Sequence, residues 1–477
     1  MTLQETSSSS STVTIVLSPA TQQPLFEVPC ATPAQIDDAV TKAKEGFLSW
    51  RQVPFSERVA ILKKFCSLFE QKKQQVGETI ATQMGRPIRY AAGEIGGVLE
   101  RANYMISVAE ESLKDEVIET TEHVQRFLRK EPLGPVVIIA AWNYPYLTMV
   151  NNVVPALLAG NSVLLKQSPQ TPKCADLFAE TFHEAGVPNQ VIQVMHTDDQ
   201  GANYLVQHPG IHYVSFTGSI AIGKTIRKTI GNAERLTIGL GMELGGKDPA
   251  YVLPDADLDF AAENIVDGAF FNTGQCCCSI ERCYVHVDVY EAFLEKAVAI
   301  TQKYKLGDPN DQETTIGPMA HVRFADKVRA QIAEAVVKGA RLLVQTDRYF
   351  PNDKPGTTYV GPQIVVNVTH DMTIMQEETF GPVLAVVPVQ SDEEAIRFMN
   401  DSKYGLTASI WTKDVDKAMD IGNQIECGTW FMNRCDYIDP ALAWVGAKES
   451  GLGFSLSKHG FDQFIRPKSY HLRLKQQ

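Results

Sequence analysis

Cys277 has surroundings that fit covalent catalysis. It lies in the stretch Phe270–Cys278, where a Gly-Gln pair precedes three consecutive cysteines and favours a turn that exposes one sulfur. A free thiol has a pKa of about 8.5 and is mostly protonated at neutral pH, so a nucleophilic cysteine needs activation. Each of the three cysteines could instead be a small buried hydrophobe.

A carboxylate and an amide elsewhere in the chain could complete such a site. Glu243 is a lone acid among glycines and apolar residues in Gly241–Lys247. Partial burial would raise its pKa and suit it to general-base catalysis, although a loop carboxylate that caps a backbone N–H would look the same. Asn143 directly follows the apolar run Val136–Ala140, where an amide can donate to an oxyanion or simply form a turn.

Two further segments could bind an anionic cofactor. Phe216–Ser219 ends an apolar run with a Gly-Ser turn and precedes a helical start, so free N–H groups and a positive dipole end would meet a ligand there. This is not the GxGxxG fingerprint, and a Gly-Ser pair before a helix is often an ordinary cap. Lys166 follows the run Val163–Leu165 and could hold ribose or phosphate, or be a solvated strand end.

These residues follow short apolar runs that alternate with segments of helix length. Strand–helix alternation with continuously apolar strands predicts a parallel sheet covered on both faces, with ligands beyond the carboxyl ends of the strands. A second α/β pattern extends from about Pro249 to Val445, and Gly245-Gly246 is the best candidate boundary. The first hundred residues are helical: Thr32–Gln35 is a helix start, and Leu62, Phe65, Cys66 and Phe69 share one face.

Composition narrows the function further. The 477 residues include 44 Lys and Arg and 56 Asp and Glu. The resulting net charge of -12 disfavours nucleic acid and anionic membranes as partners. Nine cysteines, with three adjacent, indicate a reduced protein, and the polar segment Met1–Val13 has no features of a secretory or transit signal. We therefore expect a cytoplasmic protein without a membrane span, and no metal in its site.

Six motifs, in this order and spacing, resemble the aldehyde dehydrogenase superfamily of the NAD(P)+-dependent, hydrolytic type. The resemblance extends from about residue 15 to the C-terminus. The motifs are Trp142–Pro145, Lys166, Phe216–Ser219, Glu243–Lys247, Gly274–Cys277 and Glu378–Pro382.

The resemblance implies a role for each site residue. Cys277 would be the nucleophile, Glu243 the general base and Asn143 the oxyanion donor. NAD or NADP would be the cofactor, with Lys166 at the adenosine ribose, Ser219 at the pyrophosphate and Glu378 at the nicotinamide ribose. The full set of implied cofactor-binding residues is Trp142, Lys166, Ser168, Gly218, Ser219, Gly223, Leu244, Glu378 and Phe380.

The implied reaction converts an aldehyde to a carboxylic acid. The Cys277 thiolate attacks the carbonyl, hydride transfer to the cofactor leaves a thioester, and Glu243 activates the water that hydrolyses it. The presence of Glu243 favours hydrolysis over acyl transfer to coenzyme A. A non-catalytic structural member of the family is a further alternative, which the intact Cys277, Glu243 and Asn143 disfavour.

Several positions depart from the family pattern. The common Lys-Pro-Ser-Glu is Lys166–Pro169 here, without the acid that would repel a 2′-phosphate, so we hypothesise dual or NADP+-leaning use. Ala141 replaces a usual proline, and Gly453–Ser455 replaces Gly-Arg-Glu. In the loop Asn433–Asp439, an arginine could bind a substrate carboxylate, an aspartate could bind an amine, or the two could pair with each other.

The expected fold is α/β, with two doubly wound α/β domains and a small β oligomerisation arm. The Rossmann-like cofactor-binding domain would comprise residues 1–115 and 133–245, and the catalytic domain residues 246–450. Residues 116–132 and 451–477 would form the oligomerisation arm and the C-terminal segment. The resemblance implies a homodimer or homotetramer.

Overall fold

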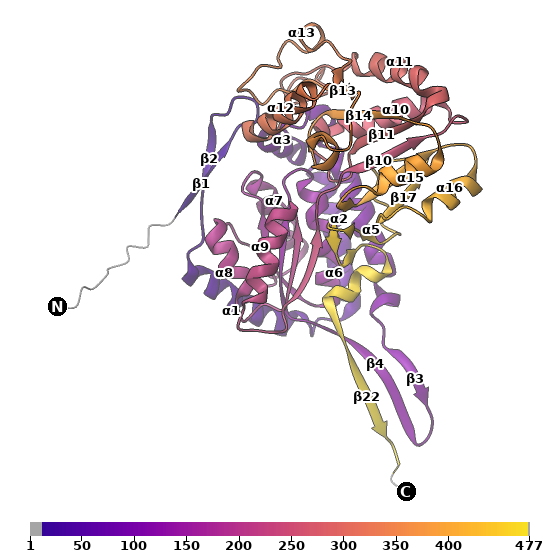
Figure 1. Ribbon diagram of the computed structural model, residues 1–477. Helices are drawn as coiled ribbons and strands as arrows, with labels where there is room; N and C mark the ends of the chain where they lie inside the picture. The colour runs from indigo at the N-terminus through magenta and orange to yellow at the C-terminus, as the bar shows by residue number, and fades with distance from the viewer. Residues whose placement is uncertain (1–11, 476–477) are drawn as a thin grey trace, which may run out of the picture.

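The computed structural model describes residues 12–475, which form two lobes and a projecting arm (Figure 1). Most of the polar segment Met1–Val13, namely residues 1–11, lies outside the described residues. Among residues 12–475, none of the helices combines the length and the apolar character that crossing a bilayer requires.

The first lobe contains the predicted parallel sheet, with strand order β20-β9-β8-β5-β6-β7. All neighbours pair in parallel except β20, which is antiparallel to β9. Ile138 packs into the core on one face of the sheet and Val137 into the core on the other, so both faces are covered. The strands are β5 (Pro135–Ala140), β6 (Ser162–Gln167), β7 (Ile192–Val194), β8 (Tyr213–Thr217), β9 (Gly239–Glu243) and β20 (Gly451–Leu452).

Helices cover this sheet on its two faces. One face packs against α2, α5, α6 and α7, and the other against α1, α8 and α9. The helices of this lobe are α1 (Pro33–Trp50), α2 (Phe55–Gln71), α3 (Lys73–Met84), α4 (Ile88–Ala91), α5 (Glu94–Leu113), α6 (Pro145–Ala159), α7 (Pro172–Ala185), α8 (Asp199–Gln207) and α9 (Ile220–Gly231). A hairpin of β1 (Val13–Leu17) and β2 (Pro24–Pro29) precedes them.

The second lobe is built on a seven-stranded sheet of order β12-β13-β14-β11-β10-β16-β17, parallel except where β12 meets β13. Its strands are β10 (Asp248–Val252), β11 (Ile280–His286), β12 (Arg341–Leu342), β13 (Gln363–Val366), β14 (Val383–Val389), β16 (Thr407–Trp411) and β17 (Thr429–Met432). The second α/β pattern of the sequence is therefore confirmed as a second doubly wound sheet.

Helices again lie on both faces of the second sheet. Those on one face are α10 (Leu258–Phe270) and α11 (Tyr290–Thr301), and those on the other include α12 (Val322–Val337), α15 (Asp392–Asn400) and α16 (Val415–Gly422). Shorter elements are η1 (Phe271–Gly274), η2 (Val287–Val289), α13 (Thr346–Tyr349), α14 (Thr373–Gln376), β15 (Tyr404–Gly405), β18 (Trp444–Val445), β19 (Ala447–Lys448), β21 (Phe454–Ser455) and η3 (Lys458–Phe464).

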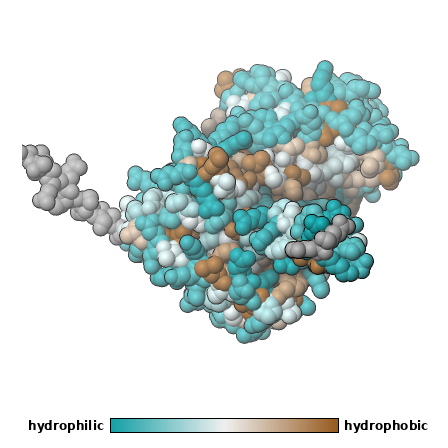
Figure 2. Space-filling view, turned by 90° about the horizontal axis from the view of Figure 1, so that it is seen from below, coloured by the Kyte–Doolittle hydropathy of each residue, from teal (hydrophilic) through white to brown (hydrophobic). Residues whose placement is uncertain are grey.

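A three-stranded antiparallel sheet forms the predicted arm. Its order is β22-β4-β3, from β3 (Glu116–Thr120), β4 (Val124–Pro132) and β22 (Ile465–Arg473). The rings of Phe127 and Tyr470 stack across it with centroids 4.5 Å apart. Figure 1 shows the arm extending away from both lobes. Seen from below, the protein is mostly hydrophilic, with scattered hydrophobic residues (Figure 2).

Local sequence signals are confirmed in the first helices. Thr32 accepts the N–H of Gln35, whose side chain in turn accepts the N–H of Thr32, at 3.3 and 2.8 Å. Cys66 is buried in the core beside Phe65. Two strands of the first sheet, β9 and β20, were not predicted. Residues Gly451–Leu452, which the sequence predicts to belong to the C-terminal segment, add a strand to the first sheet.

Candidate active site

A cleft of about 1140 Å³ contains side chains from both lobes. Every site residue predicted from the sequence lines it except Gly223. Gly223 lies behind the cleft in α9, where an added Cβ would stand 3.0 Å from Leu244 Cδ2. Its role is close packing of the helix against Leu244.

Cys277 follows a backbone segment in the left-handed region. Asn272, Thr273 and Gly274 have φ values of 55°, 60° and 66°. A side chain at Gly274 is excluded, because its Cβ would lie 2.3 Å from the backbone carbonyl of Gly381. This turn leaves Cys277 only partly buried, while Cys276 and Cys278 are buried. Cys277 is thus the least buried of the three cysteines, although all three line the cleft.

The three cysteine sulfurs form a tight group. All lie within 4.8 Å of one another, and the sulfurs of Cys276 and Cys278 are 3.5 Å apart. Both thiols also donate to Oδ1 of Asp436, at 3.1 and 3.3 Å. When the single S–H protons of Cys276 and Cys278 turn from Asp436 toward the Cys277 thiolate, these hydrogen bonds, that of Cys276 first, lower the pKa of Cys277, and burial opposes the shift. The neighbours thus favour the nucleophilic form of Cys277.

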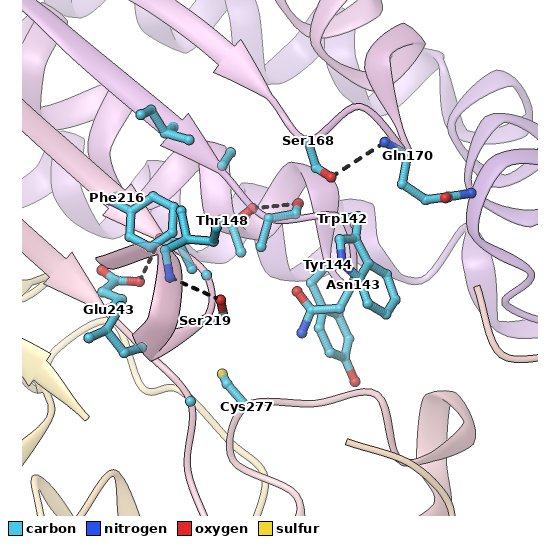
Figure 3. Close-up of a pocket in the computed structure, with 18 of the residues that line it drawn as sticks. Trp142, Asn143, Tyr144, Thr148, Ser168, Gln170, Phe216, Ser219, Glu243 and Cys277 are labelled. Carbon is cyan, nitrogen blue, oxygen red and sulfur yellow. Dashed lines mark hydrogen bonds between the residues drawn. The ribbon is translucent and has the colours of Figure 1, made fainter. Parts of the chain in front are cut away.

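Asn143 lies in the turn between β5 and α6, facing the cysteine turn. Its Nδ2 donates to the backbone carbonyl of Gln275, 3.2 Å away. Because the amide group has two N–H bonds, one remains for a ligand. Figure 3 shows Asn143 and Glu243 on the side of the cleft toward which the Cys277 sulfur points.

A buried ion pair, which was not predicted from the sequence, supports the turn that carries Asn143. Arg86 and Glu94 are joined at 2.6 Å, and Glu94 Oε1 accepts the N–H groups of Tyr146 and Leu147 at the start of α6. Arg86 also donates to the backbone carbonyl of Asn143 and, at 2.9 Å, to Oδ1 of Asn272. The pair therefore links the asparagine turn to the cysteine turn.

Glu243 is the last residue of β9 and faces the cleft. Removal from water raises its pKa, as expected for a candidate base. Ser455 donates to Oε1, and Thr217 donates to Oε2 at 3.4 Å. These hydroxyls partly oppose the rise, because they stabilise the ionised carboxylate. Ser455 belongs to the segment that departs from the family pattern, so this departure contacts the candidate base.

The two glycines after Glu243 allow close approach from two directions. A Cβ at Gly245 would lie 2.2 Å from Oε1 of Glu378, and one at Gly246 would lie 2.4 Å from the carbonyl oxygen of Cys277. Glu378 accepts the N–H of Gly246 at 3.1 Å, and burial raises the pKa of Glu378 to about 7. The Gly-Gly motif therefore lets both site residues lie against its backbone.

A second buried ion pair positions the turn that carries Glu378. Lys247 and Glu281 are 2.5 Å apart and almost fully inaccessible to solvent. Glu281 also accepts the N–H groups of Thr379 and Phe380, both at 2.8 Å. Phe380 has a φ of 55°, a conformation that these hydrogen bonds help to hold.

The cofactor end of the cleft has the features expected of an anion site. Ser219 caps α9 by accepting the N–H of Ile222 at 3.4 Å, so the N-terminus of α9 opens near the cleft. Lys166 lies within β6 rather than after it, and burial lowers its pKa. Trp142 stacks on Phe324, with ring centroids 5.1 Å apart. Gly218, Ser168 and Pro169 line the same cleft.

The loop Asn433–Asp439 contributes one charged group to the cleft. Asp436 lines it, beside the cysteines. Arg434 is exposed, and its guanidinium lies 3.6 Å from the centroid of the Tyr437 ring. Asp439 accepts the N–H of Ala441 at 2.9 Å. Neither Arg434 nor Asp439 lines the cleft.

Comparisons with known proteins agree with this geometry. Residues 6–470 match the model of the aldehyde dehydrogenase family. The chain is 33% identical over 450 residues to a succinate semialdehyde dehydrogenase [NAD(P)+] of Escherichia coli, across 94% of this chain and 96% of that protein. An NAD-dependent aldehyde dehydrogenase from Sinorhizobium meliloti gives a TM-score of 0.92 at 30% identity, over 98% and 92% of the two chains. An NADP-dependent glyceraldehyde-3-phosphate dehydrogenase from Bacillus halodurans, complexed with NADP, gives a TM-score of 0.91 at 31% identity, over 97% of this chain and 96% of that chain.

Two doubly wound sheets share a cleft that holds a thiol, an amide and a carboxylate, groups that suit the covalent oxidation of an aldehyde. The chain belongs to the aldehyde dehydrogenase family. It is an NAD(P)-dependent enzyme that oxidises aldehydes.

Proposed function

We propose that Cys277 is the nucleophile of this aldehyde dehydrogenase, Asn143 the oxyanion donor and Glu243 the general base. The observation that carries the proposal is the contact between the two turns. The Asn143 amide lies against the Gln275 carbonyl, two residues before Cys277. An aldehyde oxygen held by the second N–H of Asn143 would therefore leave its carbonyl carbon within reach of the sulfur.

The proposed first step is attack of the Cys277 thiolate on the aldehyde carbon. The carbonyl oxygen gains negative charge, which the Asn143 amide and the Cys277 backbone N–H stabilise. Loss of one such donor typically costs about 3 kcal/mol in the barrier. Arg86 and Glu94 keep Asn143 in place through its backbone carbonyl and the start of α6.

Bound NAD or NADP supplies the acceptor for the hydride that leaves the tetrahedral carbon, which re-forms the carbonyl as a thioester. Glu243 then takes a proton from water, whose oxygen attacks the thioester and releases the carboxylic acid and the thiolate. A carboxylate with a raised pKa is a stronger base than an ordinary one, which suits it to this step.

The residues at the other end of the cleft fit a dinucleotide. We assign Ser219 and the start of α9 to the pyrophosphate, Lys166 to the adenosine ribose and Glu378 to the nicotinamide ribose. Trp142, Ser168, Gly218, Leu244 and Phe380 complete the cofactor wall, and Gly223 packs behind it. Because Pro169 lines this end where relatives carry an acid, we propose dual or NADP+-leaning use.

The cysteine triplet offers matched controls for the assignment. Reduction of NAD+ or NADP+ would be followed with a panel of aldehydes for wild type, Cys277→Ser, Cys276→Ser and Cys278→Ser. We expect Cys277→Ser to lose about 10³-fold or more in kcat, and the flanking variants to retain most of their activity. Wild-type activity in Cys277→Ser would refute the nucleophile assignment.

Hydrolytic release is distinguished from acyl transfer by the product. Turnover without coenzyme A, with carboxylic acid formed in equal amount to reduced cofactor, supports Glu243 as the base. A strict requirement for coenzyme A would select the acyl-transferring alternative.

We further propose that residues 1–115 and 133–245 form the cofactor-binding domain and residues 246–450 the catalytic domain. We also propose that the protein forms a homodimer or homotetramer joined through the arm. The arm exposes Val117, Ile118 and Leu472, with 65%, 55% and 40% of their surface accessible. Light scattering of wild type and Val117→Lys would test the role of the arm, and a variant of unchanged mass would count against it.

All nine cysteines are free, which supports a cytoplasmic location.

A further inference from the structure

Arg101 is a buried cation that lines the cleft. It lies on α5 with 7% of its surface accessible, and it lines the same cleft as Cys277. Its Nη1 donates to Oδ1 of Asn151 at 3.0 Å and to the carbonyl of Leu147 at 3.4 Å. Among residues 12–475, its Nε and Nη2 have no protein acceptor, and no carboxylate forms an ion pair with it.

The carboxylates that attract Arg101 from a distance are engaged elsewhere. Glu94 accepts from Arg86 and from the start of α6, and Glu243 accepts from Ser455 and Thr217. A buried guanidinium whose Nε and Nη2 lack acceptors is unfavourable, because these N–H groups have lost water without gaining a hydrogen-bond partner. A ligand that brings a negative charge into the cleft would supply that partner.

The surroundings leave room for such a group. Gly97 lies one helical turn before Arg101 and also lines the cleft; an added Cβ there would stand 2.9 Å from Cδ2 of Leu147. Two acids share this region. Glu100 is exposed and accepts from the hydroxyl of Tyr437 at 2.6 Å. Oδ1 of Asp436 accepts from two thiols, and burial raises the pKa of Asp436 well above its ordinary value.

We infer that this enzyme prefers aldehydes with a carboxylate at the far end of the chain, and that Arg101 binds this carboxylate. The aldehyde carbon would lie at Cys277 and the anionic end at Nε and Nη2 of Arg101. Arg434, the other arginine near this region, is exposed over Tyr437 and takes no part. The inference rests on the proposed role of Cys277 in the same cleft.

The test compares substrates that differ in the end group. Steady-state kcat and KM would be measured with 4-oxobutanoate, with butanal as the neutral counterpart, with 3-aminopropanal as a cation and with glyceraldehyde 3-phosphate as a second anion. A charge-assisted hydrogen bond contributes about 1.5–3 kcal/mol, so we expect kcat/KM for 4-oxobutanoate to exceed that for butanal by about 10- to 100-fold. A wild type that prefers butanal or the amine would overturn the inference. A preference for glyceraldehyde 3-phosphate would overturn the carboxylate as the end group and assign a phosphate to Arg101 instead.

Variants then assign the preference to Arg101. Arg101→Met should lose the preference mainly through a raised KM for 4-oxobutanoate. Butanal turnover should stay within about twofold of wild type at a pH above the acidic limb of kcat, because Arg101 also stabilises the ionised form of Glu243. Arg101→Lys should keep part of it, and Arg434→Met should behave as wild type. An equal loss with both substrates would show that Arg101 only supports Asn151, and would overturn the inference.

The two proposals fail in different ways. If wild type oxidises butanal through Cys277 without any preference for the acid, the residue roles stand and only the Arg101 inference fails. If Cys277→Ser remains active, the residue roles fail. Should Arg101→Met not fold, the wild-type substrate series and Arg101→Lys still decide the question.

Discussion

Arg86 and Glu94 form an ion pair of 2.6 Å although their side chains are only 3% and 0% accessible. Neither residue lines the cleft. It acts on the site through the Asn143 carbonyl, the Asn272 side chain and the start of α6. Such a pair makes catalytic geometry depend on residues remote in the sequence.

Glu94→Gln should therefore lower both stability and activity. Removing one partner of a buried pair leaves an uncompensated charge, so we expect a loss of about 3–5 kcal/mol in the free energy of unfolding, measured in denaturant. The kcat should also fall, because Asn143 loses its support. Asp38→Asn is the control, because Asp38 and Lys42 form an exposed ion pair. This variant should leave the denaturant midpoint of unfolding unchanged. Equal midpoints for the two variants would contradict the prediction.

Ser455→Ala should shift the pH dependence of thioester hydrolysis. The Ser455 hydroxyl stabilises the ionised form of Glu243, so its loss raises the pKa of Glu243 further. Glu243 acts as a base only when it is deprotonated, so the acidic limb of kcat should move to higher pH. Ser455→Thr should restore the wild-type profile. A limb that moves to lower pH, or not at all, would argue against Glu243 as the base.

The adjacent glycines should respond differently to alanine. At Gly245 the new methyl group would meet the mobile end of Glu378, so we expect normal folding and a raised KM for the cofactor. At Gly246 it would meet the backbone of Cys277, which cannot yield easily, so we expect loss of stability. Gly231→Ala, with nothing within 4 Å of its Cβ, is the control. Thermal unfolding together with cofactor kinetics would separate the three results.

Pro169→Glu should move cofactor preference toward NAD+. The new carboxylate would repel a 2′-phosphate and could bind a ribose hydroxyl instead. We expect the ratio of kcat/KM for NADP+ to that for NAD+ to fall by about tenfold or more, equivalent to about 1.4 kcal/mol. Pro169→Gln, which lacks the charge, is the control. The prediction is wrong if both variants change the ratio equally.

Apolar runs and motif order predicted the framework because these signals are local. The runs that became β5, β6 and β8 are mostly apolar and lack the polar–apolar alternation of a half-buried strand, as expected of strands buried on both faces. β9 lacked this signal. Its Gly239 and Gly241 disfavour a strand, yet they are needed there, because a Cβ at either would collide with Tyr213. Only the packed sheet supplies that reason.

The missed site residues are charged residues that tertiary packing buries. Arg86 lies in a short polar stretch whose spacing does not distinguish it from a solvated side chain. Arg101 is spaced with Val98 and Met105 on the buried face of α5, a helical pattern that could have indicated its burial. Arg86 contacts Asn272 across 186 residues of sequence. Lys247 belonged to a recognised motif, but its partner Glu281 did not. A single sequence cannot show which distant charges will meet, because their pairing follows from the fold.

One hydrogen-bond partner of Glu243 comes from near the C-terminal end of the chain. Its hydrogen bond to Ser455 connects residues 212 positions apart, and β20 pairs with β9 at the same place. At about 5–20 residues per second, the ribosome delivers that partner about 10 to 40 s after the strand that carries Glu243. During this interval the nascent chain presents an unpaired strand edge beside its candidate base. Biosynthesis itself therefore delays assembly of the base pocket, and such an edge offers a binding surface to chaperones.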